Sequence, residues 1–437
     1  MPLRKSAEYS RQAGFWQYSG CAILSSMNNA VRRFIAILSV LALFAPLFAV
    51  ELNSSRGFYL DLPEGFAITQ SDGSSKFSFS NQQGTVLVDI LIYAPATYAS
   101  VDEFSGKITA KLQAKIQDAW NFDYAGRKCR ILLAQFTNNL QGYVLCIDSL
   151  DSAKLPEGEQ NFDFLLLAYT QTALFKSAEP LLASVVDAFS LRQSERYKPG
   201  PLLTAKQTRT KPLLVAKTTQ FAGMDVSASY DKNLAVLAQE LVEREYKVLS
   251  MYAGSPALIE DAVYRFYRQT YRAAYPALLP LAIAFSQAWE RANPGGTTGT
   301  AQAEVQSSVK PHFGVPGNPE GYTRALLAWV QNFTYVRNPS GSDVVNPITA
   351  GFEQTGDCDS RVLVMAILLA YEHIDSILMI SLVHEHALIG VALDAKGAKF
   401  PYNNASWLIG ETTAHVELGL IDQTQSGIED WFGIDFQ

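Results

Sequence analysis

The chain has 437 residues, 48% of them hydrophobic and 18% charged, and this composition excludes wholesale disorder, which requires few hydrophobic residues and a high net charge. There are 35 Lys and Arg against 42 Asp and Glu, so the net charge is −7, which argues against nucleic acid as a partner because phosphate neutralisation needs an excess of basic residues. Four cysteines in this length exclude a disulfide-dense scaffold.

An apolar segment near the N-terminus predicts export. The uncharged run Phe34–Val50 has 17 residues and contains Pro46, whereas a membrane-spanning helix needs about 20. Its basic start, apolar middle and small residues at the end are typical of a secretory signal peptide over residues 1–49, with Met27 as an alternative start. We therefore expect an exported, periplasmic protein without a membrane span in the mature chain. A secreted form and an uncleaved N-terminal anchor are the alternatives.

The next segment, residues 50–193, is predicted to be an α+β module in which an antiparallel sheet carries helices on one face. Ser100 and Glu103 form a capping box, and apolar residues recur every three or four positions from Val101 to Ile116, which predicts a helix there. The stretches GFYLDLPEGF and LASVVDAFSL resemble the small PsbP-like module, and this resemblance implies no catalytic residues. Strands rich in β-branched and aromatic residues are predicted at 57–63, 76–80, 85–93, 128–136, 143–150 and 162–169.

Two further segments precede the part of the chain that carries chemistry. Residues 194–230 are predicted to be a basic linker, because Lys, Arg and Pro gather between residues 196 and 220 without an acid. From residue 231 the pattern is helical and contains four tyrosines at helical spacing, which are interpreted as core, with a ligand platform as the alternative. These are Tyr264, Tyr267, Tyr271 and Tyr275.

Cys358 is the candidate nucleophile. It lies in the stretch GDCDSR, directly before the apolar helical run VLVMAILLAYEHI. A helix N-terminus favours negative charge, so this position predicts a lowered thiol pKa and a larger thiolate fraction. Gly356 allows a tight bend before the helix. Asp357 and Asp359 are interpreted as first-turn caps rather than as acid–base groups.

His386 and Glu411 are the candidate base and its orienting carboxylate, since a cysteine nucleophile needs a base and the base needs a partner that holds it. The stretch ILMISLVHEHALIGVAL follows the Cys358 helix, and its two histidines, His384 and His386, would point to the same face of a strand. Glu411 ends the alternation of side chains along ASWLIGETT, the next predicted strand.

The order of these motifs resembles the transglutaminase-like superfamily of papain-type thiol enzymes over residues 320–422. ALLAWVQNFTYVRN is similar to the family's lead-in, TGDCDSR to its nucleophile motif, HALIGVAL to its histidine strand and WLIGETT to its acid strand. The resemblance implies a papain-like domain within residues 231–437, reached through the helical lead-in. It also implies that His386 rather than His384 is the base. Many members carry Asp where this chain has Glu411.

The resemblance implies acyl transfer at an amide bond of a peptide or protein substrate through a thioester on Cys358. Hydrolysis is favoured over cross-linking, the backbone N–H of Cys358 is the expected oxyanion donor, and no cofactor or metal is implied. A non-catalytic binding or scaffolding protein of the cell envelope that keeps the fold is the alternative. In that case residues 294–318 could plug the cleft.

Two smaller alternatives concern the other ligand-type residues. Cys358, His384 and His386 form a conceivable zinc set, although no second pair of ligands follows. Cys129 and Cys146 flank a predicted hairpin turn, so an oxidising compartment would permit a disulfide between them, with two buried free thiols as the alternative.

Overall fold

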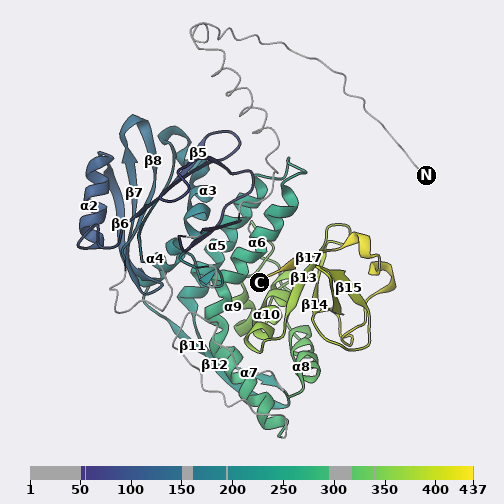
Figure 1. The fold of residues 1–437 in the computed structure, drawn as a ribbon. Coiled ribbons are helices and arrows are strands. Elements are labelled where there is room, and N and C mark those ends of the chain that lie inside the picture. Colours follow the sequence, from purple (N-terminus) through teal and green to yellow (C-terminus); the bar gives the residue numbers. More distant parts are fainter. Residues whose placement is uncertain are drawn as a thin grey trace, which may run out of the picture. The chain divides into compact units, whose positions relative to one another are not determined.

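The computed structural model describes residues 51–54, 56–149, 161–192, 195–294, 317–338 and 341–436. The predicted signal peptide, Met27 and nearly all of the predicted plug at 294–318 lie outside these residues. All described residues belong to one unit, Phe48–Gln437. No helix in the described part of the chain is long and apolar enough to cross a membrane. The predicted α+β class is confirmed, with helices and antiparallel sheets in both halves (Figure 1).

A seven-stranded antiparallel sheet forms the core of the N-terminal module, in the order β3-β4-β5-β9-β8-β7-β6. Side chains alternate between buried and partly exposed along β4 and β5, as a period of two requires. A smaller sheet, in the order β1-β2-β10, lies beside it. The strands of both sheets are β1 (Glu51–Ser54), β2 (Phe58–Asp61), β3 (Ala67–Ser71), β4 (Lys76–Ser80), β5 (Val86–Tyr93), β6 (Lys115–Tyr124), β7 (Arg127–Phe136), β8 (Leu140–Ile147), β9 (Asp163–Gln171) and β10 (Phe189–Ser190).

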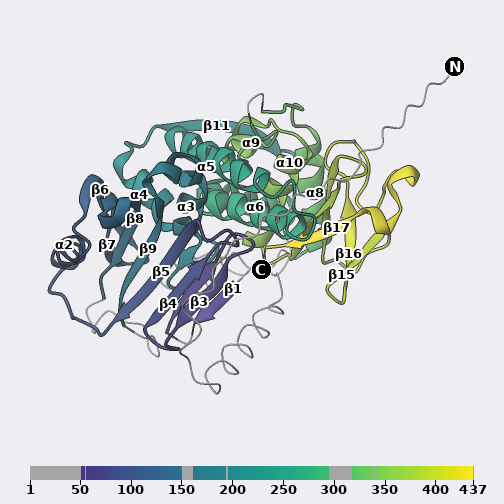
Figure 2. The ribbon, with the colours of Figure 1, turned by 90° about the horizontal axis from the view of Figure 1, so that it is seen from above.

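Two helices cover opposite faces of the seven-stranded sheet, whereas the sequence predicted helices on one face only. Helix α2 (Val101–Lys111) packs on Leu132, Val144 and Leu165, and helix α3 (Phe175–Asp187) packs on the alternate residues of the same strands. Figures 1 and 2 show α2 and α3 on the two sides of the sheet. Two faces are covered because both sides of β8 and β9 are apolar, so neither can face water.

Helix α2 begins as predicted and ends earlier than predicted. The Ser100 hydroxyl accepts a hydrogen bond from the Glu103 N–H, and the Glu103 carboxylate accepts one from the Ala99 N–H. The helix stops at Lys111 because Gln113 adopts a positive φ of 48°, which an α-helix does not allow. Residues 115–124, partly predicted as helix, instead form edge strand β6.

Cys129 and Cys146 are both buried and free, so the structure does not contain the disulfide that the predicted hairpin would permit. Strands β7 and β8 pair Cys129 with Ile147 and Arg130 with Cys146. Neighbouring positions on a strand point to opposite faces. The Cys129 side chain therefore lies in the core under α3, and that of Cys146 lies in the core under α2.

The basic segment predicted as a linker is folded, which corrects the interpretation of residues 194–230. It contains helix α4 (Pro201–Arg209) and the hairpin β11 (Leu214–Phe221) and β12 (Met224–Asp231), which turns at Ala222 and Gly223, both with positive φ. Phe221 and Tyr230 from the hairpin enter the core of the C-terminal half. Sequence reasoning missed strand β11 because polar residues interrupt it, so it contains no long apolar run.

The C-terminal half consists of helices against a five-stranded antiparallel sheet, in the order β15-β16-β14-β13-β17. Helix α10 packs with β13 and β14 in one large core (Figure 1). The elements of this half are α5 (Lys232–Ser250), α6 (Ile259–Ala274), α7 (Leu279–Ala292), α8 (Pro319–Gln331), α9 (Pro347–Glu353), α10 (Cys358–Tyr371), β13 (Ser376–Ser381), β14 (His386–Val391), β15 (Lys399–Tyr402), β16 (Ala405–Gly410) and β17 (Phe432–Asp435).

Helix α6 links the two halves through a buried polar network. Arg265, only 2% exposed, donates to the Glu245 carboxylate at 3.0 Å, to the Ser184 hydroxyl and to the Asp61 carbonyl. The Glu245 carboxylate also binds Arg244 and accepts from Ser184. Burial alone would raise the pKa of Glu245, but Arg265 and Arg244 hold it below its usual value, so this carboxylate stays charged.

Replacing Arg265 with Met should lower the free energy of unfolding by about 3 kcal/mol, because Glu245 would keep its buried charge and lose a partner. Urea unfolding followed by circular dichroism measures this loss. The matched control is Arg324→Met, which breaks a surface pair with Glu320 and should lower the free energy by less than about 1 kcal/mol. Equal losses in the two variants would contradict the importance given to the buried pair.

Candidate active site

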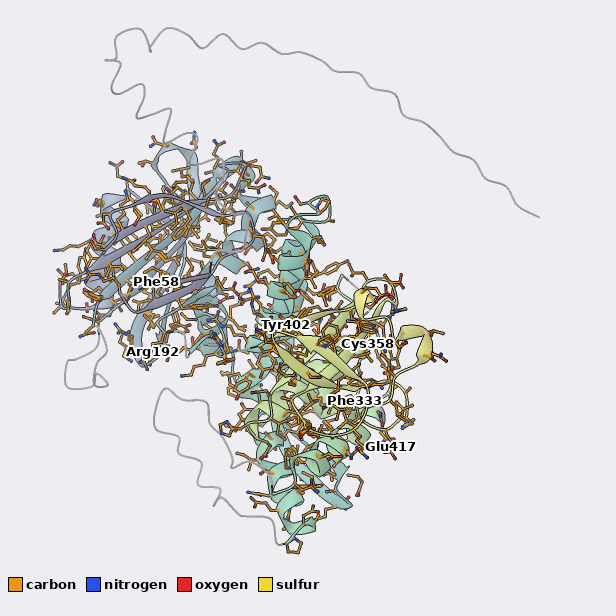
Figure 3. All side chains as sticks on the ribbon, turned by 45° about the vertical axis from the view of Figure 1, so that its right-hand side comes forward. Phe58, Arg192, Phe333, Cys358, Tyr402 and Glu417 are labelled. Carbon is orange, nitrogen blue, oxygen red and sulfur yellow. The ribbon has the colours of Figure 1, made fainter. Side chains whose placement is uncertain are left out.

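Cys358, labelled in Figure 3, is the first residue of helix α10. Its side chain is buried, with 6% of the residue exposed. Asp357 is the N-cap, as the sequence predicted, and its carboxylate accepts hydrogen bonds from the N–H and the hydroxyl of Ser360. The Cys358 sulfur is within hydrogen-bonding reach of the backbone N–H of Ala387, the residue after His386. The helix start and the histidine strand are thus in contact at the sulfur.

Gly356 lies two residues before Cys358, at a position that favours glycine. Its φ is +153°, and a Cβ at this position would lie 2.7 Å from the Ser360 Cβ. The backbone N–H of Gly356 donates to the Thr334 carbonyl, and its carbonyl accepts from Val336, so the lead-in segment runs beside the approach to Cys358. This pairing fixes the position at which helix α10 begins.

His386 and Glu411 meet on neighbouring antiparallel strands. His386 is the first residue of β14, and Glu411 directly follows β16, its partner strand. His386 Nε2 lies 2.7 Å from Glu411 Oε2, while Glu411 Oε1 accepts hydrogen bonds from the N–H and hydroxyl of Thr413, both at 2.6 Å. Burial would raise the pKa of Glu411, but these hydrogen bonds hold it below its usual value. A charged carboxylate thus orients the imidazole.

His384 does not share the face of His386, because it lies in the turn of residues 382–385 rather than on the strand. Its Nε2 is 3.3 Å from Asp430 Oδ2, and its ring lies against Trp431. Trp431 also contacts the His386 ring edge-on, at 6.3 Å between centroids. The described residues contain no group of three or more ligand-type side chains placed to hold a metal ion, so the zinc set of Cys358 and the two histidines is not assembled in them.

Asp359 connects the thiol to helix α6, a contact that sequence reasoning missed. Asp359 Oδ1 accepts a hydrogen bond from Cys358 Sγ at 3.7 Å, and Oδ2 accepts one from the Tyr267 hydroxyl at 3.0 Å. Burial and the nearby charge of Asp357 raise the pKa of Asp359 to about 7. Tyr267 belongs to the tyrosine stripe predicted as core, and its buried ring agrees with that interpretation.

The thiol pKa moves in the direction opposite to the sequence-based expectation. Burial raises the pKa of Cys358 well above its usual value, and the charges of Asp359 and Asp357 raise it further. The N–H groups of Ala387 and Asp359 offset this only in part. The expectation was wrong because it counted the helix N-terminus and ignored the two carboxylates that flank the sulfur. The Cys358 thiol is therefore protonated at neutral pH.

Arg361 ties together the three segments that surround the site. It is 2% exposed and donates to the carbonyls of Gly356, Thr412 and Phe333, which lie before Cys358, after Glu411 and after helix α8. An arginine in the first turn of a helix that is otherwise buried is the signal that could have identified this residue. Breaking its contacts would release all three segments at once.

No protein-family model matches the chain, and no curated protein matches it. Among solved structures, the chain is weakly similar to cyanobacterial PsbP (CyanoP) from Synechocystis sp. PCC 6803, with 12% identity, a TM-score of 0.26, and coverage of 34% of this chain and 94% of that one. It is also similar to a protein from Bacteroides thetaiotaomicron VPI-5482, with 10% identity, a TM-score of 0.20, and coverage of 52% and 79%.

Replacing Asp359 with Asn should increase the rate of Cys358 alkylation by iodoacetamide about tenfold at pH 8. Removing one negative charge beside the sulfur lowers the thiol pKa, and one pKa unit corresponds to a tenfold change in the thiolate fraction. Because Asp359 is neutral below pH 7 and charged above it, the rate-versus-pH profile of the variant should shift to lower pH. Mass spectrometry of the Cys358 peptide measures the rate.

The matched control is Asp394→Asn, which removes a carboxylate whose side chain is fully exposed. This variant should alkylate at the wild-type rate, and Cys129 and Cys146 should react more slowly than Cys358 in every variant because they are buried within the sheet cores. An unchanged rate in Asp359→Asn would contradict the assigned effect of the Asp359 charge.

Proposed function

We propose that the protein is an exported, periplasmic thiol amidase of transglutaminase-like type, which hydrolyses amide bonds of peptide or protein substrates. The observation that carries the proposal is the 2.7 Å contact between His386 Nε2 and Glu411 Oε2, made next to a helix that begins at Cys358. This arrangement has the order nucleophile, base and orienting acid. The three ordered sequence motifs support it independently.

The proposed reaction begins with proton transfer from the Cys358 thiol to His386 as the sulfur attacks the substrate carbonyl. Nε2 is held by Glu411, which leaves Nδ1 to accept this proton. The C–N bond then breaks, the imidazolium gives its proton to the leaving amine, and a thioester remains. Water attacks the thioester with His386 as base, which releases a carboxylic acid and restores the thiol.

Three features of the site support this proposed reaction. The N–H of Cys358 lies in the first turn of α10, where backbone donors are free to stabilise the oxyanion. The raised pKa of Cys358 means that the base takes the proton during attack rather than in a resting ion pair. Trp431 shields the imidazole from one side.

A second candidate is a non-catalytic binding protein of the cell envelope. The observation that favours it is the hydrogen bond of the Cys358 thiol, which goes to Asp359 rather than to an imidazole nitrogen in the described part of the chain. The raised thiol pKa and the 6% exposure of Cys358 point the same way. The two candidates differ in whether an acyl group ever becomes attached to Cys358.

Replacing His386 with Ala should lower kcat/KM for amide hydrolysis about 10³-fold, because the thiol would lose its proton acceptor. The assay incubates the protein with denatured casein and identifies new peptide termini by mass spectrometry. His384→Ala is the matched control, since it removes a histidine two positions away that contacts Asp430 and not Glu411. This control should retain activity within a few-fold of the wild type.

A covalent probe separates the two candidate functions. Peptidyl fluoromethyl ketones should label Cys358 in the wild type and in His384→Ala, and label His386→Ala far more slowly. Equal labelling of the two histidine variants, together with no cleavage of casein, would overturn the enzymatic proposal in favour of the binding protein.

A further inference from the structure

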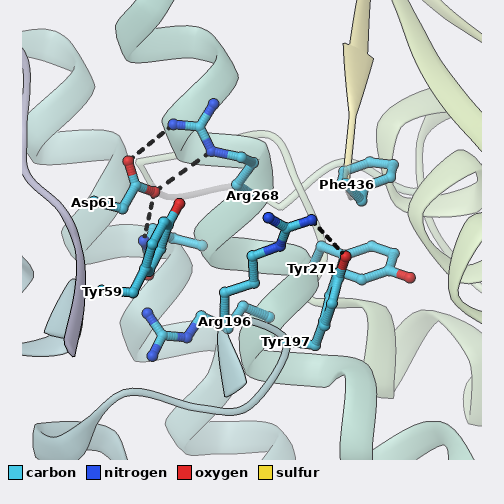
Figure 4. A pocket seen from close by; sticks show the side chains of 9 residues that line it. Tyr59, Asp61, Arg196, Tyr197, Arg268, Tyr271 and Phe436 are labelled. Carbon is cyan, nitrogen blue, oxygen red and sulfur yellow. Dashed lines mark hydrogen bonds and ion pairs between the residues drawn. The ribbon is translucent and has the colours of Figure 1, made fainter. Parts of the chain in front are cut away.

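A cavity whose lining includes none of Cys358, His386 and Glu411 lies where four segments of the chain meet. It has a volume of about 30 Å³ and is lined by residues of β2, the segment before α4, helix α6 and the end of β17. Figure 4 shows Arg196 and Arg268 reaching toward the same space, with Asp61 on one side and the rings of Tyr271 and Phe436 on the other.

The lining of this cavity carries three guanidinium groups, Arg196, Arg268 and Arg272, and one carboxylate, Asp61. Asp61 is committed to Arg268, since its Oδ1 lies 2.9 Å from Arg268 Nη2 and its Oδ2 accepts from Arg268 Nε at 3.4 Å and from Gln269 at 3.3 Å. Burial would raise the pKa of Asp61, but the arginines hold it below its usual value, so it is charged. The remaining two guanidinium groups give the cavity a positive excess.

Arg272 is 4% exposed, and each of its hydrogen bonds ends on a neutral oxygen. The acceptors are the carbonyls of Lys198, Asp187 and Phe189 and the hydroxyls of Tyr124 and Ser190. These contacts orient the guanidinium but do not neutralise it. The Asp61 charge acts on Arg272 at longer range, but no carboxylate in the described residues forms an ion pair with it, so an anion bound in the cavity would be stabilised.

Arg196 makes one hydrogen bond to a side chain in the described residues, so most of its N–H donors are available to a ligand. Among the described residues, its guanidinium binds the Tyr197 hydroxyl at 2.8 Å and lies over the same ring. The charges of Asp375 and Asp435 act on Tyr197, but neither forms an ion pair with Arg196 within the described ranges. The planar fork of Arg196 therefore points into the cavity with donors for a planar anion.

We propose that this cavity binds the carboxylate group of a small organic acid, held by the guanidinium fork of Arg196, with the positive charge of Arg272 and the Asp61–Arg268 pair alongside. Arginine forks match the two oxygens of a carboxylate, and charge-assisted bonds of this kind are about twice as strong as neutral ones. A carboxylate rather than a phosphate fits because the volume of about 30 Å³ suits a small planar group. The rings of Tyr59, Tyr271 and Phe436 give the attached apolar carbon chain a surface to pack on.

Calorimetric titration of the purified protein with propionate, at constant ionic strength, tests this site. Saturable binding is expected, with an affinity at least tenfold weaker in Arg196→Gln, and no binding of the neutral isostere propionamide. Arg291→Gln is the matched control, because Arg291 is an exposed arginine of α7 that bonds only the carbonyl of its own helix in the described structure. This control should bind propionate as the wild type does.

Three outcomes would overturn the proposal: no saturable binding of propionate, equal binding by wild type and Arg196→Gln, or tighter binding of inorganic phosphate than of propionate. Circular dichroism of Arg196→Gln verifies that the variant is folded. Cys358→Ala should bind propionate like the wild type, so the result is independent of the proposed amidase activity.

Discussion

Helix α6 is the element on which both halves of the protein depend, because it contacts each of them through a different set of side chains. Its arginines, above all Arg265, enter the polar network with Glu245, Ser184 and the Asp61 carbonyl. Its tyrosines lie in the core of the C-terminal half, and Tyr267 donates to Asp359 beside Cys358. A single helix therefore joins the N-terminal module to the segment that carries Cys358.

Local sequence signals predicted an element correctly where the local physical preferences agreed with one another. The Ser100 cap, the apolar alternation of β5 and the start of α10 at Cys358 were predictable because capping, strand period and burial all favour the same structure. The pairing of His386 with Glu411 was also predictable, since the order of two adjacent strands places their ends together.

The features that sequence reasoning missed depend on contacts between distant segments. The hairpin of β11 and β12 has partly exposed, alternating polar side chains, and it is anchored by residues such as Phe221 and Tyr230 that dock in the core of the C-terminal half. Asp359 looked like a first-turn cap, and its role beside the thiol follows from Tyr267, which is 92 residues away in the chain. The thiol pKa had the wrong predicted sign for the same reason, because burial depends on the whole fold.

The pairing of Cys129 with Ile147 in the β7–β8 hairpin has a consequence for folding. A slip of one residue along this hairpin would place Cys129 directly opposite Cys146 and would also turn every side chain of one strand to the other face of the sheet. In an oxidising compartment such a slipped hairpin could be locked covalently, whereas the native one keeps its sulfurs on opposite faces. A bond between these two sulfurs would thus mark a misfolded sheet, and the free thiols are a chemical signature of the correct register.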